Sequence, residues 1–246
     1  MQTIDETREL SPNAETSARP ALSSPGMQSR MLMVTLAVID ILFIVANVLH
    51  WRIGDGDPVF SNPAWDGDID QSFIESFGYI LIVSAIVGLT FLAVRRRSFV
   101  LGVWILIQLA LVSDDLFMIH ERGGELFVGL GLGGGFGLRA QDVGELAVWG
   151  AMIVPLGILL LIAHFTASAQ DRRDSLTLFL LTGVLAMFAV VLDAVSHPLS
   201  AVLPSQVGTG LTLLETAGEL VAMSLIAVAV HRMTLGLTLR GDRTVE

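Results

Sequence analysis

The chain of 246 residues contains no cysteine and no lysine, and only 15% of its residues are charged. Without cysteine there are no disulfides, no thiolate metal ligands and no thiol catalysis. Without lysine the chain cannot form a Schiff base with retinal or pyridoxal phosphate, which excludes a rhodopsin. The net charge of −10 argues against nucleic acid as a partner, because nucleic-acid binding needs a basic surface.

The chain is rich in apolar residues, which make up 53% of it and give a mean hydropathy of +0.70. These values are ordinary for a multi-pass membrane protein. A helix that crosses about 30 Å of hydrocarbon needs about 20 mostly apolar residues. The sequence predicts six such spans, at residues 31–50, 76–95, 98–120, 142–165, 175–197 and 209–231. The expected fold class is therefore all-α, an integral membrane bundle of six transmembrane helices.

The two ends of the chain are more polar than the spans. Residues 1–30 are rich in Ser, Pro, Thr and Ala, a composition typical of a disordered tail. We expect residues 31–233 to form the transmembrane domain and residues 234–246 to form a C-terminal tail.

Arginine placement predicts the orientation in the membrane. One side of the six-span arrangement carries Arg30, Arg95, Arg96, Arg97, Arg172, Arg173, Arg232, Arg240 and Arg243. The opposite side carries only Arg52, Arg122 and Arg139. Cytoplasmic loops are enriched in basic residues, so we expect both termini in the cytoplasm and the protein in the inner (plasma) membrane. The 54–70 loop, with its five aspartates, then lies outside.

Ionisable residues gather at the predicted outer ends of four spans. They are Asp114, Asp115, His120, Glu121, Glu145, Asp193, His197, Glu215 and Glu219. Asp193 and His197 are four residues apart and share one helix face, as do Glu215 and Glu219. Four helices of alternating direction thus bring ionisable groups to one depth in the membrane.

The sequence LVSDDLFMIHE, residues 111–121, is expected to be the outer end of one continuous helix. On such a helix Asp114 and Glu121 lie about 20° apart. Asp115 and His120 point away from that line, so not all four side chains can contact the same ligand.

The energetics of these groups indicates where they point. A lipid-facing charge costs about 2.5–3.5 kcal/mol, so the carboxylates must face the bundle interior. The few cationic groups cannot neutralise them, so protons or bound cations are required. Carboxylates with some imidazole suit Fe, Zn or Mn, and pairs of such ions occur in carboxylate-rich helical bundles. We therefore predict that all nine residues contribute to a divalent transition-metal site. The alternatives are a metal-free proton or ion path and a structural hydrogen-bond network.

Other polar features have simpler explanations. Asp142 precedes a span and is expected to be a helix cap. Asp40 lies alone within the first span, where a proton relay and a polar helix–helix contact are equal alternatives. The glycine-rich connection 123–138 is interpreted as a flexible or re-entrant lid or as an apolar linker.

Two motifs resemble those of an uncharacterised group of bacterial multi-pass membrane proteins. The first is Asp114-Asp115-x4-His120-Glu121-Arg122-x-Gly124, and the second is LRAQDVGE, residues 138–145. The resemblance covers the third to the sixth span and implies no activity.

The leading functional hypothesis is a membrane-embedded metalloenzyme. A metal site near the outer surface could hydrolyse or oxidise a lipid or another small hydrophobic or amphiphilic substrate. The alternative is a proton- or cation-coupled transporter or channel that uses the same acidic cluster. The inner halves of the spans carry almost no charge beyond Asp40, and no internal repeat is evident, so the transporter ranks second. Haem ligation by His120 and His197 ranks third, because haem does not require so many carboxylates.

Overall fold

The computed structural model describes residues 25–135, 138–192, 195 and 204–242, and helix dominates this part of the chain. No strand forms among these residues, although an isolated bridge joins Gly135 to Leu138. The expected all-α class is confirmed. Residues 1–24 of the expected N-terminal tail lie outside the described residues.

Six helical segments are long and apolar enough to cross a membrane, so the chain is a multi-pass membrane protein, as predicted. The helices are α1 (Pro25–Ile53), α2 (Phe73–Arg96), α3 (Phe99–Phe117), the short α4 (Ile119–Gly129), α5 (Ala140–Thr166), α6 (Ala169–Ala186), its π-helical extension η4 (Met187–Leu192) and α8 (Ser205–Asp242). The first and last helices extend further than predicted. Residues 25–30 form the first turns of α1, and α8 continues through residues 234–242.

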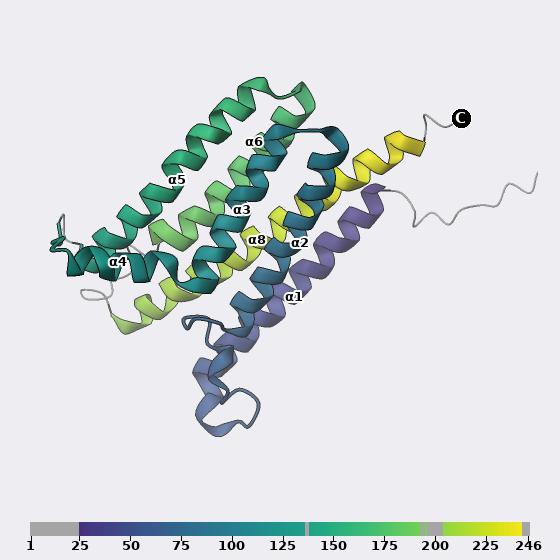
Figure 1. The fold of residues 1–246 in the computed structure, drawn as a ribbon. Coiled ribbons are helices and arrows are strands. Elements are labelled where there is room, and N and C mark those ends of the chain that lie inside the picture. Colours follow the sequence, from purple (N-terminus) through teal and green to yellow (C-terminus); the bar gives the residue numbers. More distant parts are fainter. Residues whose placement is uncertain (1–24, 136–137, 193–194, 196–203, 243–246) are drawn as a thin grey trace, which may run out of the picture.

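Helix α8 is the central helix of the bundle. It packs against α1, α2, α6 and η4, and in Figure 1 it runs from the end beside α4 to the end where α1 begins. Glycines on α2 permit this close packing. A Cβ at Gly78 would lie 2.5 Å from the sulfur of Met223, and one at Gly88 would lie 2.6 Å from Cγ1 of Val230. Most of the buried apolar side chains accordingly come from α2, α3 and α8.

The two ends of the bundle differ in charge. The start of α1, the α2–α3 turn, the α5–α6 turn and the end of α8 lie at one end (Figure 1). We call it the arginine end, because it carries Arg95, Arg96, Arg97, Arg172, Arg173 and Arg232. The opposite, acidic end carries the α1–α2 connection, α4 and the start of α5. Which side of the membrane each end faces stays a prediction.

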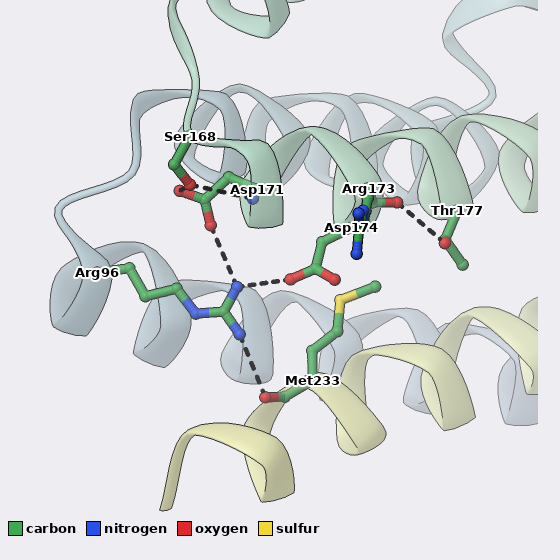
Figure 2. Close-up of polar contacts among 7 residues, drawn as sticks. All are labelled: Arg96, Ser168, Asp171, Arg173, Asp174, Thr177 and Met233. Carbon is green, nitrogen blue, oxygen red and sulfur yellow. Dashed lines mark hydrogen bonds and ion pairs between the residues drawn. The ribbon is translucent and has the colours of Figure 1, made fainter. Parts of the chain in front are cut away.

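At the arginine end, Arg96 joins α2 to α6 and α8 (Figure 2). Its Nη1 donates to Asp171 Oδ1 at 3.1 Å and to Asp174 Oδ2 at 2.5 Å, and its Nη2 donates to the Met233 carbonyl at 3.4 Å. Ser168 caps α6 by accepting the Asp171 N–H at 3.2 Å. Because Arg96 is nearly buried and bonded to both α6 and α8, it fixes how these helix ends meet.

Asp40 makes a polar contact between helices. Its side chain is buried, and its Oδ1 accepts a 3.0 Å hydrogen bond from the Ser224 hydroxyl of α8. This contact is the polar helix–helix interaction that was one of the two alternatives for Asp40. The hydroxyl partner allows a polar group to lie between α1 and α8 within the apolar span.

The connection between α1 and α2 is folded onto the helices. Asn47 Nδ2 donates to the Trp65 carbonyl at 2.8 Å, and Trp51 Nε1 donates to Asp66 Oδ1 at 3.0 Å. The Trp65 ring packs edge-on against Phe73, with ring centroids 4.8 Å apart. These contacts fix the connection at the acidic end and position the residues that lead into α2.

Candidate functional site

The chain changes direction inside the predicted third span. Helix α3 ends at Phe117, Met118 adopts a left-handed conformation with φ 51° and ψ 45°, and α4 begins at Ile119. The prediction of one continuous helix through His120 is therefore wrong. Helix α4 instead crosses the acidic end at a steep angle to α3 and α5 (Figure 1).

This change of direction brings Asp114 and His120 together. Asp114 is fully buried, and its Oδ1 accepts the backbone N–H of His120 at 2.9 Å. The carboxylate thus satisfies one of the N–H groups at the start of α4 that have no partner within the helix. The expected alignment of Asp114 with Glu121 on one face is wrong for the same reason, since the two residues lie on different helices.

The imidazole of His120 is oriented by the same carboxylate. Asp114 Oδ2 lies 2.8 Å from His120 Nδ1. An ionised carboxylate only accepts hydrogen bonds, so Nδ1 carries the proton and Nε2 of the neutral ring keeps its lone pair. Nε2 lies 4.0 Å from Glu121 Oε1, and the ring packs beside Trp149 with centroids 5.8 Å apart.

The electrostatic environment of His120 and Glu121 is strongly acidic. Burial alone lowers the pKa of the His120 imidazole, but the hydrogen bond and charge of Asp114 raise it above its usual value. The charges of Glu121 and Glu145 raise it further. Burial also raises the pKa of the Glu121 carboxyl, and the charge of Asp70 adds to this effect. The cluster therefore favours bound protons or cations.

Helix α4 packs directly against the start of α5. A Cβ at Gly144 would lie 2.7 Å from the carbonyl oxygen of Gly124, so the two backbones meet at a point that leaves no room for a side chain. Gln141 connects the helices, because its Nε2 donates to the Glu121 carbonyl at 2.9 Å and to Glu145 Oε1 at 2.8 Å. This contact places the carboxylate of Glu145 beside α4.

Asp142 caps the start of α5 as the third residue of the helix, not as the residue that precedes it, because the N-cap is Arg139. Asp142 Oδ2 accepts the backbone N–H of Arg139 at 2.9 Å, and its Oδ1 accepts a 2.6 Å hydrogen bond from the Arg139 guanidinium. The glycine-rich connection before it is partly helical, because α4 continues to Gly129. The first part of this connection is therefore a short helix and not a loop.

Two residues that the sequence analysis did not select lie near Asp115. Glu75, in the first turn of α2, accepts hydrogen bonds from the Tyr79 hydroxyl and the Gln71 N–H, and Ser72 caps the same turn. Asp115 interacts electrostatically with Glu75. The sequence signal that could have identified Glu75 is the Ser72–Glu75 capping pattern, followed one turn later by Tyr79, the only tyrosine of the chain.

The remaining predicted ligands are less closely connected to this site. Glu215 and Glu219 lie one turn apart on α8, are half-buried, and each has an interaction partner. Asp193 and His197 lie outside the described residues. Among the residues that the structure describes, no three His, Asp or Glu side chains are arranged to hold a metal ion.

The arrangement of Asp114, His120 and Glu121 is suited to proton transfer or to cation binding. A buried carboxylate orients one imidazole, whose second nitrogen faces another carboxylate. Such a group can transfer a proton or donate a lone pair to a cation.

Comparison with known protein families identifies the family of the chain. Residues 30–233 match the family model described as a domain of unknown function (DUF8692), and the chain belongs to this family. No curated protein and no solved structure matches it.

Proposed function

We propose that this DUF8692 protein is a membrane-embedded, metal-dependent enzyme, a hydrolase or an oxidase, that acts on a lipid or another hydrophobic substrate. The observation that carries the proposal is the Asp114–His120 pair. Metal-bound histidines commonly donate their second ring N–H to a carboxylate, which fixes the tautomer and orients the ring. His120 has this arrangement, with Nδ1 held by Asp114 and Nε2 directed toward Glu121.

The hydrogen bonds of Asp114 support a role for it that differs from the role of the other predicted ligands. Both oxygens of Asp114 are engaged by His120, so Asp114 orients the ring. His120 Nε2, Glu121 and Glu145 are the proposed metal ligands, because their charges act on one another. Their oxygen-rich donor set with one imidazole fits divalent Fe, Zn or Mn.

The remaining acids would complete or support this site. They are Asp115, Asp193, Glu215 and Glu219, together with His197 as a second imidazole. A bound metal would activate water for hydrolysis or, if redox-active, dioxygen for oxidation. Glu75 beside Asp115 provides further carboxylate capacity to accept protons at the acidic end.

The surroundings of the site favour an apolar substrate. Leu126 on α4 and Leu130 directly after it are 70% and 84% exposed, and α5 exposes Ile153 and Val154. These side chains suit contact with lipid. A substrate dissolved in the outer half of the plasma membrane could therefore reach His120 along α4 and α5 without crossing water.

Elemental analysis and an absorption spectrum of detergent-purified protein test the proposal. We expect one or two transition-metal ions per chain, with zinc indicating hydrolysis and iron indicating oxidation. Addition of a chelator should then abolish turnover of a lipid substrate. Metal-free protein that retains its activity would refute the proposal.

A second candidate is a proton- or cation-coupled transporter, which the buried Asp40–Ser224 contact favours. This contact places an ionisable group between α1 and α8, away from the acidic end. Proton-coupled uptake by metal-free protein in vesicles, lost in Asp40→Asn, would select the transporter over the enzyme.

A further inference from the structure

A cavity lies at the arginine end of the bundle, opposite the acidic site. Its volume is about 400 Å³, and it is lined by Arg96, Gln170, Asp174, Thr177, Ala229, Arg232, Met233 and Gly236. These residues come from the last turn of α2, the first turns of α6 and the last third of α8. The cavity thus lies where three spanning helices approach the membrane surface.

The charges that line the cavity favour an anion. Arg96 forms ion pairs with Asp174, at 2.5 Å, and with Asp171, at 3.1 Å, so its charge is fully neutralised (Figure 2). Arg232 is exposed and has no ion pair among the described residues. In addition, the Nε–H of Arg96 is buried and has no hydrogen-bond partner within the part of the chain that the structure describes. Among the described residues, one unpaired cation, Arg232, therefore lines the cavity, and a second lining residue, Arg96, keeps a buried N–H donor without a partner.

Part of the cavity lining is apolar and contains small residues. Ala229, Met233 and Gly236 follow one another at helical spacing on α8. A Cβ at Gly236 would meet no atom within 4 Å, so this part of the lining is open. The cavity lining combines an unpaired cation with apolar residues, as an amphiphile requires.

We propose that this cavity binds the phosphate group of an anionic phospholipid. Arginine binds phosphate through its planar set of N–H donors, and basic residues at a membrane surface attract anionic lipids. Arg232 contacts the phosphate, and the apolar residues of α8 that line the cavity accommodate the glycerol and the start of the acyl chains. This inference does not depend on the proposed enzymatic function, because the cavity is at the other end of the bundle.

Native mass spectrometry of the full-length protein in detergent tests the inference. We expect bound phosphatidylglycerol in preference to phosphatidylcholine, with the affinity for phosphatidylglycerol falling about tenfold in Arg232→Gln. The control is Arg173→Gln, which removes the same charge from an exposed position on α6 that does not line the cavity. Equal losses in the two variants would overturn the inference in favour of a general charge effect.

A second variant and a second ligand separate the remaining explanations. Ala229→Phe fills the cavity without changing charge, and it should also reduce lipid binding while the protein remains monodisperse. Inorganic phosphate alone should not displace the lipid at millimolar concentration. Displacement by inorganic phosphate, or full lipid binding by Ala229→Phe, would refute a lipid site in this cavity.

Discussion

Asp114 is the residue on which the acidic site depends. It is fully buried at the end of a spanning helix, yet both of its oxygens have partners on His120, the backbone N–H and the ring Nδ1. A buried carboxylate is costly unless it accepts hydrogen bonds. Through these two bonds one carboxylate both caps the start of α4 and orients the imidazole of His120.

The substitution Asp114→Asn should lower the stability of the protein. Asparagine has one acceptor oxygen, so one of the two donors of His120 would lose its partner, at a cost of about 1–3 kcal/mol. Thermal unfolding in detergent measures the effect. Asp115→Asn is the matched control, because Asp115 accepts neither bond from His120. An equal melting temperature for the two variants would contradict this role of Asp114.

Residue chemistry could be predicted from the sequence more readily than residue contacts. The accumulation of acids and His120 at the span ends was visible, because charged residues are rare in apolar segments. The contact of Asp114 with His120 was not, since it requires the backbone to turn between them. Glu75 was missed because it immediately precedes the predicted span 76–95, although it lies in the first turn of α2.

At the scale of elements, helix α4 is the main departure from the predicted fold. The spans themselves were predictable, because their length and hydropathy follow from the membrane thickness. The break at Met118 was not, since neither glycine nor proline marks it. A left-handed methionine is unfavourable by roughly 1–2 kcal/mol, and the hydrogen bonds of Asp114 help to maintain it.

The contact between α4 and α5 should be sensitive to a single methyl group. Gly144→Ala places a Cβ 2.7 Å from the Gly124 carbonyl, and such overpacking typically costs about 1–3 kcal/mol. We expect a lower melting temperature. Gly150→Ala on the same helix is the control, because its Cβ would meet nothing within 4 Å and alanine favours helix. A Gly144→Ala variant as stable as Gly150→Ala would show that the helices do not meet this closely.

At the scale of the whole molecule, the helix directions separate an arginine end from an acidic end. This separation predicts that the arginine end is cytoplasmic. The natural chain has no cysteine, so single cysteines provide clean labels. An impermeant maleimide added to intact cells should label Val59→Cys in the α1–α2 connection and spare Arg173→Cys. The reverse labelling pattern would place the acidic end in the cytoplasm and contradict access from the outer leaflet.

The metal content of a His120→Gln variant tests the central claim most directly. Glutamine cannot supply the imidazole lone pair at Nε2, so the purified variant should lose most of the metal that the natural protein retains. His164→Gln is the control, since His164 lies near Ser175, with 3.4 Å between Nδ1 and Oγ, on the arginine side of the bundle. The account predicts metal loss in His120→Gln and normal metal content in His164→Gln. Equal metal content in His120→Gln and the natural protein, with both folded, would contradict it.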